Sequence, residues 1–589
     1  VVLEALPLTP NGKLDRGALP APEAGGEESV YEAPRTAVEE LVAGIWVEVL
    51  RRERVGVRDD FFELGGHSLL ATQVVSRLRQ ALGVEVPLRT LFESSTVETL
   101  AARLDSLRRA DAPAAAPPLL PVPRDGSPLP LSFAQQRLWF IQRLETESAA
   151  YNMPYALRMQ GAVDARALER SLTRLVGRHE ALRTRFPEVD GRAAQVIHPP
   201  VPVPLPRIDL RRLAAGGRER EARRLAEAEA LRPFDLARGP LLRCALLGMD
   251  ETEHVLFFCM HHIVSDGWSM GVAAREVSAL YAAYSRGEEP VLPELPVQYA
   301  DYAAWQRAWL RDEVLERQLA YWRERLAGAP PLLEIPTDRP RAAEQSARGG
   351  FHAFTVPADV ARALRETGRR EGATLFMVLL AGWQALLSRY SGQHDVVVGS
   401  PISGRTTVEV EGLIGFFVNT LALRSDVSHE GSFRDLLRQV RETTLGAYQH
   451  QDLPFEKLVE ELGVERSLAH TPLFQVMFSL QNNRGAELEL GGAGLDVLGG
   501  GSAPVKFDLT CSLAEAGEEI RGELAYRLEL WDGGSMERMA RHLETLLDSM
   551  AARPEARVSE VSLLRGAERV QVLEAWNATA AALPRACVH

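Results

Sequence analysis

The chain has 589 residues, of which 46% are hydrophobic and 25% are charged, and its formal net charge at neutral pH is −13. At roughly 100 to 200 residues per domain, this length predicts about three to five folding units. The acidic balance argues against a nucleic-acid groove, because such a groove needs clustered Lys and Arg to displace phosphate counterions. The longest apolar runs, such as residues 374–383, are shorter than the ~20 residues that span a bilayer, so we expect no membrane segment.

The chain contains four cysteines, Cys244, Cys259, Cys511 and Cys587. They are scattered, without the CxxC spacing of zinc sites or the regular pattern of a disulfide framework. This distribution fits reduced thiols in a cytosol. The first residues also lack the basic leader and the apolar core of a secretory signal. We therefore expect a cytoplasmic protein without a structural metal.

The first predicted folding unit is helical and covers residues 30–108. Thr36 and Glu39 have the spacing of a capping box ahead of an apolar-periodic run. Residues 68–83 carry apolar side chains at positions 70, 74, 75, 78 and 82, which would share one face of a helix. Residues 97–107 give a third helical pattern. About 75 residues of this kind predict a small helical bundle that can fold alone.

A proline-rich stretch and a longer α/β region follow. Seven prolines between residues 110 and 130 predict an extended, semi-rigid linker over 109–128. Beyond it, helical patterns such as residues 167–183 alternate with β-rich runs such as residues 254–263, which indicates an α/β fold. The length favours two lobes, an N-lobe over 129–300 and a C-lobe over 301–565.

Ser68 follows Gly65 and Gly66 and begins the second predicted helix. Position alone favours a serine that caps the helix by accepting a backbone N–H. A nucleophile is a weaker alternative, because Leu70 stands where a G-x-S-x-G elbow needs glycine. A third alternative is an attachment point for a phosphate-bearing arm, since the helix dipole and free N–H groups favour the charge of a phosphate.

Residues 59–79, DDFFELGGHSLLATQVVSRLR, resemble the peptidyl carrier protein of nonribosomal peptide synthetases. The resemblance implies a four-helix bundle in which Ser68 receives 4′-phosphopantetheine from a phosphopantetheinyl transferase. The thiol of this arm would carry an aminoacyl or peptidyl group as a thioester.

Residues 6–20, LPLTPNGKLDRGALP, are similar to the last motif of an adenylation domain. This similarity implies that residues 1–25 are the C-terminal remnant of such a domain. Lys13 matches the lysine that contacts the acyl-adenylate in that family. Leu14 follows the Gly-Lys pair, which excludes a P-loop. Because the rest of an adenylation domain is not part of the sequence, we expect no activity from Lys13.

His261 and His262 follow the apolar run 255–259. Successive side chains of a strand point to opposite faces, so we expect one histidine to pack and the other to work. The same alternation argues against a metal site. A simpler alternative is that both are structural histidines, in the core or on the surface, whose hydrogen bonds are satisfied. Asp266 and Gly267 complete an HHxxxDG pattern, which adds a carboxylate and a glycine amide that a substrate can approach closely.

Six motifs in order make residues 131–475 resemble the condensation domain of nonribosomal peptide synthetases. They occupy residues 132–140, 178–186, 260–269, 299–307, 414–424 and 450–456. A seventh, at 466–475, departs from the family in having His470 where Asn is usual. The resemblance implies two chloramphenicol-acetyltransferase-like lobes with a tunnel between them, which carrier arms enter from opposite faces. In the implied reaction, an acceptor amine attacks the donor thioester and an amide forms.

The resemblance also implies roles for single residues. His262 would be the active histidine, as base, as hydrogen-bond positioner or as stabiliser of the intermediate, and an ordinary pKa near ~6.5 would let it accept a proton at neutral pH. Asp266 would pair with an arginine, for which Arg405 is the candidate, and the Gly267 amide would polarise the thioester carbonyl. The catalytic set is thus His261, His262, Asp266 and Gly267, with Arg405, Arg137 and Trp139 as support, and with Trp268, Ser269 and Asn419 as tunnel residues. A simpler alternative for Asn419 is a tie between loops.

Three relatives within the same fold are weighed by motif. The double histidine argues against heterocyclisation, and GGHS in place of GGDS in the carrier favours condensation over epimerisation. The motifs look most like those that join an L-configured donor to an L-configured acceptor. An epimerisation-type domain and a non-catalytic domain that recruits partners remain the alternatives.

Residues 572–589 resemble the junction into a following adenylation domain, so 566–589 is expected to be a linker. The implied partners are an upstream adenylation domain, a downstream acceptor carrier domain and the phosphopantetheinyl transferase. The substrates would be aminoacyl or peptidyl thioesters.

Overall fold

The computed structural model describes residues 31–109, 116–343, 346, 348–428, 430–463, 469–481, 495–497 and 505–580. The chain forms two compact units that divide between residues 115 and 116. The predicted adenylation remnant with Lys13 lies outside the described residues, and so does Cys587. The described cysteines Cys244, Cys259 and Cys511 are buried free thiols.

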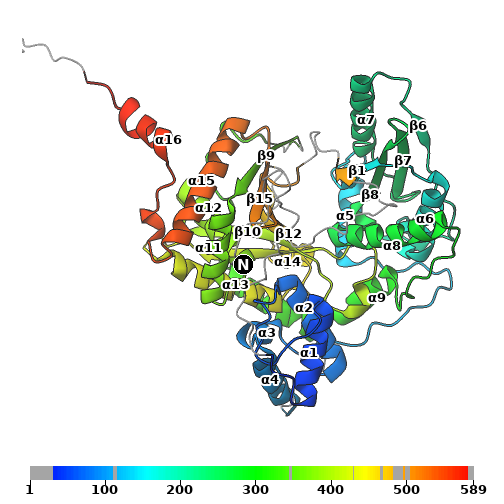
Figure 1. The fold of residues 1–589 in the computed structure, drawn as a ribbon, viewed down its shortest axis with the longest axis horizontal. Coiled ribbons are helices and arrows are strands. Elements are labelled where there is room, and N and C mark those ends of the chain that lie inside the picture. The colour runs from blue at the N-terminus through cyan, green and yellow to red at the C-terminus, as the bar shows by residue number, and fades with distance from the viewer. Residues whose placement is uncertain are drawn as a thin grey trace, which may run out of the picture. The chain divides into compact units, whose positions relative to one another are not determined.

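Residues 31–109 form four helices around a small apolar core (Figure 1). These are α1 (Ala37–Leu50), α2 (Ser68–Leu82), α3 (Leu88–Glu93) and α4 (Val97–Arg109). The predicted capping box begins α1, where the Thr36 side chain accepts a hydrogen bond from the N–H of Glu39. Trp46 and Phe61 meet edge to face at 5.1 Å in a fully buried centre. The four-helix bundle is therefore confirmed.

Residues 116–128 belong to the second unit and are bound along its surface. Leu119 is buried, and the carbonyl of Pro117 accepts a 2.7 Å hydrogen bond from Trp305 Nε1. The N–H of Val122 and the guanidinium of Arg124 both bond Asp301 at 2.8 Å. This part of the predicted linker is thus held by side chains far away in sequence, which a count of prolines does not reveal.

The N-lobe of the second unit is built on a five-stranded sheet in the order β13-β1-β8-β7-β6. Its strands are β1 (Asn152–Gln160), β6 (Arg207–Asp209), β7 (Leu242–Gly248), β8 (Glu253–His261) and β13 (Leu495–Val497). Short strands lie nearby, namely β2 (Thr184–Arg185), β3 (Glu188–Val189), β4 (Arg192–Ala193) and β5 (Val196–Ile197). The helices are α5 (Phe133–Leu144), α6 (Ala165–Arg178), α7 (Ala215–Ala230) and α8 (Gly267–Ser285). The apolar run predicted as a buried strand lies in β8, between β1 and β7.

Strand β13 shows that the lobes are not continuous in sequence. Its residues come from the range predicted as C-lobe, yet it pairs antiparallel with β1 of the N-lobe sheet. The boundary predicted at residue 300 therefore does not hold for residues 495–497. A strand can join whichever sheet edge is open to its N–H and C=O groups, and an edge of this kind is not visible in the sequence.

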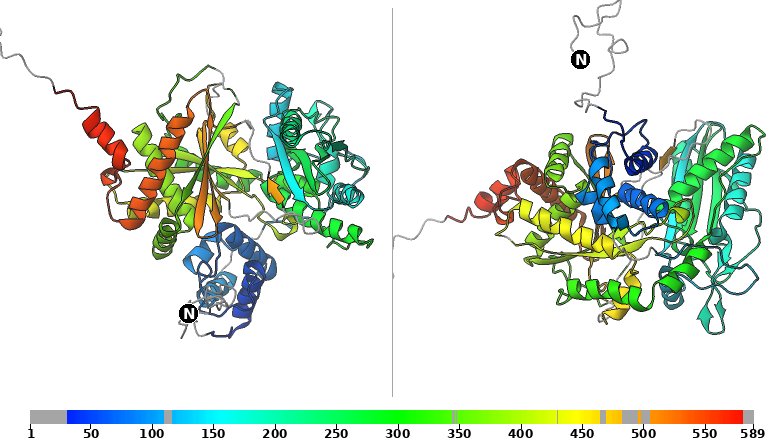
Figure 2. Two further views of the ribbon diagram at one scale, coloured as in Figure 1. Left: turned by 45° about the horizontal axis from the view of Figure 1, so that its top comes forward. Right: turned by 90° about the horizontal axis from the view of Figure 1, so that it is seen from below.

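The C-lobe contains a six-stranded sheet in the order β11-β10-β12-β14-β15-β9. The strands are β9 (Gly349–Val356), β10 (Asp395–Ile402), β11 (Asn419–Asp426), β12 (Val476–Gln481), β14 (Leu509–Ala516) and β15 (Glu519–Arg527). Helices α11 (Ala358–Arg370), α12 (Leu375–Ser391), α13 (Phe433–Gln449) and α15 (Gly533–Ala552) cover one face of it (Figure 2). The remaining helices are α9 (Tyr299–Trp309), α10 (Asp312–Leu326), α14 (Phe455–Glu461) and α16 (Gly566–Val570).

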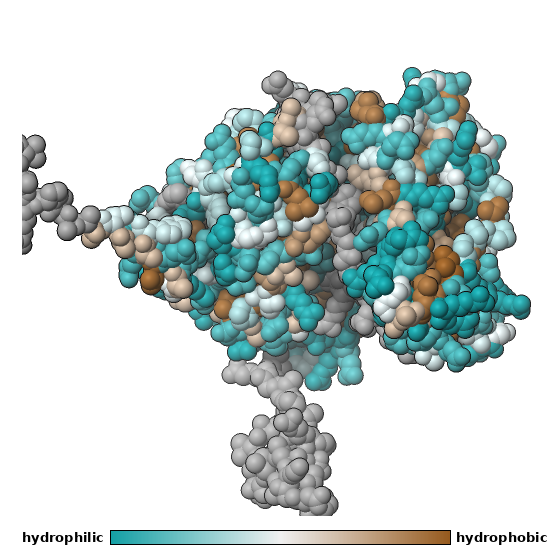
Figure 3. Space-filling view, turned by 90° about the horizontal axis from the view of Figure 1, so that it is seen from above, coloured by the Kyte–Doolittle hydropathy of each residue, from teal (hydrophilic) through white to brown (hydrophobic). Residues whose placement is uncertain are grey.

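The surface and the apolar helices agree with the composition. The face drawn in Figure 3 is mostly hydrophilic, and its apolar residues form small separate groups. Within the described residues no single helix is long and apolar enough to cross a membrane, although α11 and α12, bent by 107°, pass that test as a pair. Helix α12 is apolar because its residues from Met377 to Ser388 are buried in the C-lobe.

Candidate functional site

The two histidines lie where β8 ends and the chain turns toward α8. The N–H of His262 donates to the carbonyl oxygen of Tyr151, the residue just before β1, at 2.9 Å. A single 3-10 turn, His262–Val264, then leads to Asp266, which is the N-cap of α8. Leaving the strand at this point removes the strict alternation of faces.

His261 is the histidine that packs. Its side chain is 1% exposed and lies among the rings of Tyr151 and Phe234. Its Nδ1 accepts a 3.1 Å hydrogen bond from the N–H of Ile263, so the neutral ring carries its proton on Nε2. Burial lowers the pKa of His261 to about 3. His261 thus stabilises the turn that presents His262.

His262 is half-buried, and one of its ring nitrogens, Nε2, has no partner among the residues that the structure describes. Its Nδ1 lies 2.9 Å from the carbonyl oxygen of Ser265. A carbonyl can only accept, so the neutral ring must carry its proton on Nδ1, and the Nε2 lone pair remains available. The ring meets Phe416 edge to face, with centroids 4.9 Å apart. The site therefore offers a hydrogen-bond acceptor of fixed orientation.

The pKa of His262 is lower than the ordinary value expected from the residue type. Burial of the ring, followed by the positive charge of Lys506, lowers this pKa to about 3. Lys506 belongs to the C-lobe, and its ammonium lies 4.6 Å from the centre of the Tyr151 ring. A base this weak cannot retain a proton at neutral pH. Its chemistry is that of a neutral acceptor.

We predict that His262 stays neutral from neutral pH down to about pH 5, where an ordinary histidine would be almost fully charged. The unfolded chain binds a proton near pH 6.5 and the folded site only near pH 3. This histidine therefore lowers stability as the pH falls through about 6.5. Carbon-13 NMR of labelled histidines would follow the titration, with His262→Asn to assign the signal. A midpoint near 6.5 would contradict the prediction.

Asp266 and Arg405 form a buried group between the two lobes. They are 2% and 3% exposed, and Arg405 Nη2 lies 3.2 Å from Asp266 Oδ1. The second carboxylate oxygen accepts from the N–H of Phe417 at 2.9 Å. Arg405 Nη1 donates to the carbonyls of Val410 and Leu413. The pair thus ties the start of α8 to the connection between β10 and β11 of the C-lobe.

Gly404 is required next to this pair. Its φ is +64°, and a Cβ at this position would lie 1.9 Å from the carbonyl oxygen of Phe417. Only glycine combines this backbone conformation with such a close approach. The loop after β10 can therefore bring Arg405 against Asp266 only because residue 404 has no side chain.

Gly267 is the first residue of α8 and is exposed to solvent. Asp266 caps the helix by accepting from the N–H of Ser269, while the N–H of Gly267 has no acceptor among the described residues. No atom lies within 4 Å of the place where a Cβ would stand. The positive end of the 19-residue helix α8 is thus open to solvent at Gly267, five residues after His262 in the chain.

The residues predicted to line a tunnel are held by other contacts. Ser269 is fully buried and bonds Asp266, Arg405 and Gly415, so it belongs to the ion-pair group. Trp268 Nε1 donates to Glu411 O at 2.8 Å. The amide of Asn419 ties the loop at 451–455 through Gln451 O, Leu453 O and the N–H of Phe455. These contacts favour the simpler alternative for Asn419, although it also borders a pocket.

The two supporting residues on α5 make different contacts. Arg137 pairs with Glu456 of the C-lobe at 2.9 Å, so it links the lobes. Trp139 donates from Nε1 to Phe186 O and stays within the N-lobe. His470, the departure from the family motif, makes a local contact with Thr471 O and lies apart from this network.

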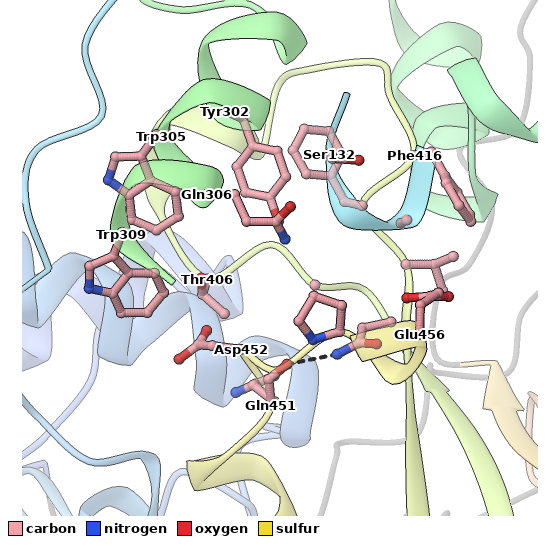
Figure 4. Close-up of a pocket in the computed structure, with 16 residues that line it drawn as sticks. Ser132, Tyr302, Trp305, Gln306, Trp309, Thr406, Phe416, Gln451, Asp452 and Glu456 are labelled. Atoms are coloured by element: carbon pink, nitrogen blue, oxygen red, sulfur yellow. Dashed lines mark hydrogen bonds between the residues drawn. The ribbon is translucent and has the colours of Figure 1, made fainter. Parts of the chain in front are cut away.

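A pocket borders the site on the side of α9 (Figure 4). Aromatic side chains of α9 lie at one end and Phe416 at the other, with Gln451, Asp452 and Glu456 along the third side. Neither Phe416 nor Lys506 was singled out from the sequence. Phe416 lies inside the recognised motif at residues 414–424, but the motif did not assign a role to it. Lys506 lies outside every recognised motif.

Ser68 occupies a different position from the one expected of a helix cap. His67 is the N-cap of α2 and makes no side-chain cap bond, so Ser68 is the first helical residue. The Ser68 hydroxyl oxygen is buried and has no partner among the described residues. The first turn contains no acidic residue to repel a phosphate. A hydroxyl without a competing bond at this helix end fits phosphopantetheine attachment, provided that the side chain turns outward for loading.

Comparisons with known proteins agree with this arrangement. Residues 127–573 match the family model described as "Condensation domain", and residues 40–104 match "Phosphopantetheine attachment site". A linear gramicidin synthase of Brevibacillus parabrevis is 52% identical over 594 residues, which cover 100% of this chain and 8% of that protein. The chain thus spans less than a tenth of that relative.

Solved structures share the fold of the second unit. The X-domain from teicoplanin biosynthesis is 32% identical, with a TM-score of 0.70, over 76% of this chain and 100% of its own. It has also been solved in a complex with OxyB. The first condensation domain of the calcium-dependent antibiotic synthetase, in complex with a substrate analogue, is 25% identical, with a TM-score of 0.63, over 75% of this chain and 100% of its own. The chain therefore belongs to the nonribosomal peptide synthetases, as a segment in which a phosphopantetheine-attachment domain precedes a condensation domain.

Proposed function

We propose that the second unit forms a peptide bond between a donor held on Ser68 and the amine of an acceptor held on a downstream carrier domain. The observation that carries this proposal is that one turn, residues 262–267, holds His262, whose Nε2 has no partner among the described residues, and Gly267, whose N–H has no acceptor among them. One group accepts a hydrogen bond and the other donates one. Amide formation from an activated acyl group needs both, at the amine and at the carbonyl oxygen.

Each residue then has a defined part. When bound to Ser68, 4′-phosphopantetheine supplies the thiol that holds the donor acyl group as an activated thioester. His262 Nε2 accepts a hydrogen bond from the incoming amine and orients the nitrogen lone pair toward the carbonyl. The Gly267 N–H, at the positive end of α8, stabilises the negative charge that develops on the carbonyl oxygen. As the C–N bond forms, the C–S bond of the donor breaks and one proton passes from the amine to the leaving sulfur. Because its pKa is about 3, His262 orients the amine without retaining this proton.

The finer assignments of substrate and partner are part of the same proposal. An L-configured donor and an L-configured acceptor are supported by the motifs around His262. An upstream adenylation domain is supported by the motif at residues 6–20, and a downstream adenylation domain with its carrier by residues 572–589. A phosphopantetheinyl transferase is supported by the match of residues 40–104 to the attachment-site family.

A recruiting domain is the second candidate, favoured by one observation. The X-domain that resembles the second unit has been solved in a complex with another protein, OxyB. A recruiting domain has no need of an acceptor nitrogen kept neutral and oriented, which is why we favour catalysis.

The test is transfer of cargo between carriers. The chain is loaded with an aminoacyl arm and mixed with a separately loaded acceptor carrier, and the mass of both proteins is measured. A lengthened peptide on the acceptor is the expected result. If Ser68 is loaded and every acceptor stays unextended, the condensation proposal fails. Exchange of the α-proton of the cargo in deuterated water would then identify an epimerisation-type domain.

We predict that Ser68→Ala abolishes loading, because the alanine side chain has no hydroxyl to form the phosphodiester bond. Intact mass after incubation with a phosphopantetheinyl transferase and coenzyme A measures this directly. Ser106→Ala, an exposed serine on α4, is the matched control and should load like the wild type. Loading of the Ser68→Ala chain would show that the arm is attached elsewhere.

A further inference from the structure

Phe416 lines the pocket of Figure 4, and its ring contacts that of His262. The empty space of the pocket, counted together with the open solvent at its mouth, is about 520 Å3, and Phe416 lies at one end of it. The same ring lies with its centroid 4.9 Å from that of His262, at an interplanar angle of 64°. Phe416 is only 8% exposed. Phe416 therefore borders both the pocket and the imidazole.

The backbone around Phe416 is fixed from the N-lobe. Four successive residues, 414 to 417, each bond an N-lobe or α9 side chain through the backbone. The bonds are Ile414 N to His179 Nδ1 at 3.3 Å, Gly415 N to Ser269 Oγ at 3.1 Å, Tyr299 Oη to Phe416 O at 2.6 Å and Phe417 N to Asp266 Oδ2 at 2.9 Å. A Cβ on Gly415 would lie 2.0 Å from the Tyr299 ring, which shows how close this packing is. The position of Phe416 is thus determined by several independent contacts.

The pocket is a place where water can collect. Its lining includes Ser132, Gln306, Thr406, Gln451, Asp452 and Glu456, all of which have polar groups. Water that reached His262 would find the same Nε2 acceptor as the amine. It could then attack the donor carbonyl, so that a C–O bond forms, the C–S bond breaks, and a proton passes from the water to the sulfur. The products would be a free acid and a thiol, and the cargo would be lost.

We propose that Phe416 is a positioning residue that closes the pocket off from His262, so that water in the pocket does not compete with the acceptor amine. The proposal rests on the proposed function for its consequence, loss of cargo. Its geometric part, access from the pocket to the imidazole, can be measured on the chain without any arm. The two parts can therefore fail separately.

The first measurement uses the unloaded chain. Diethyl pyrocarbonate acylates neutral imidazoles that solvent reaches, and peptide mass spectrometry separates His262 from His261. We expect acylation of His262 to become about five-fold faster or more in Phe416→Ala, and much less so in Phe416→Leu, which retains a bulky apolar group. His261 is 1% exposed and serves as the internal reference. An unchanged rate at His262 would overturn the proposal.

A matched control enlarges the same pocket at its other end. Trp309 lines the pocket on α9, far from Phe416 in Figure 4. Trp309→Ala should leave the acylation rate of His262 unchanged, because the Phe416 ring remains in place. Equal acceleration in both variants would show that a general loosening of the fold, and not the loss of the Phe416 ring, exposes His262. Thermal unfolding of each variant confirms that the fold is retained.

The second measurement uses the loaded chain and follows the partition of cargo between peptide and free acid. Phe416→Ala should shift this partition about five-fold or more toward free acid. Phe416→Leu should keep the partition close to that of the wild type. If the wild-type chain transfers nothing, the proposed function fails, while the acylation result still decides whether Phe416 closes the pocket off from His262. If transfer proceeds and the partition is the same in Phe416→Ala, the role of Phe416 in excluding water is refuted.

Discussion

Arg405→Ala is expected to destabilise the second unit by about 3 to 5 kcal/mol and to leave no measurable condensation. The variant leaves the Asp266 carboxylate buried at 2% exposure without its guanidinium partner. It also removes the donor to the carbonyls of Val410 and Leu413. Uncompensated burial of a charge is among the most costly single changes in a protein. Chemical unfolding that resolves the second unit from the carrier unit would measure the loss.

A surface ion pair gives the matched control for this variant. Arg286 and Glu288 are paired at 2.7 Å, but their side chains are 59% and 56% exposed. Arg286→Ala should change stability by no more than about 0.5 kcal/mol. The double variant Asp266→Ala with Arg405→Ala tests the pair itself. Its loss in free energy of unfolding should be smaller than the sum of the losses in the two single variants. A soluble and fully active Arg405→Ala chain would refute the role of the ion pair.

Local sequence patterns predicted the elements that depend on near neighbours. The capping box at Thr36 begins α1, and the apolar run before His261 forms the buried strand β8. In both cases the signal and its cause lie within a few residues, as with side-chain capping and strand burial. The burial of His261 and the half-buried position of His262 follow from the end of β8 in the same way.

Features that depend on distant residues were not visible in the sequence. Nothing in the proline-rich stretch shows that Asp301 will bind Val122 and Arg124. Nothing in the C-lobe range shows that residues 495–497 will pair with β1. Such contacts depend on which edges and carboxylates remain open once both lobes have folded. The tertiary arrangement therefore decides them.

The candidate site shows the same division. The HHxxxDG pattern identified His262, Asp266 and Gly267 as a group, and the helix cap at Asp266 explains why these residue types share a turn. The pattern could not give the pKa of His262, because that value depends on burial and on Lys506 from the other lobe. It also missed Phe416, whose position depends on contacts across more than a hundred residues of sequence.

His262→Ala is expected to lower the rate of condensation by about 100-fold, because the amine is no longer oriented, while Ser68 still accepts its arm. The variant removes the acceptor that orients the amine, whereas the carrier unit folds on its own core and is untouched. Initial rates of peptide formation on an acceptor carrier, at equal loading of Ser68, would measure the effect. Wild-type rates in this variant would remove His262 from its proposed role.

His262→Asn separates the chemistry of the imidazole from its structural bond. The asparagine amide can place its NH2 near the position of Nδ1 and donate to Ser265 O, but it has no group at the position of Nε2. We therefore expect this variant to unfold like the wild type and still to condense as poorly as His262→Ala. If His262→Asn were as active as the wild type, the bond to Ser265 would be the whole function of the residue. The lone pair on Nε2, to which we assign the orientation of the amine, would then have no part in the reaction.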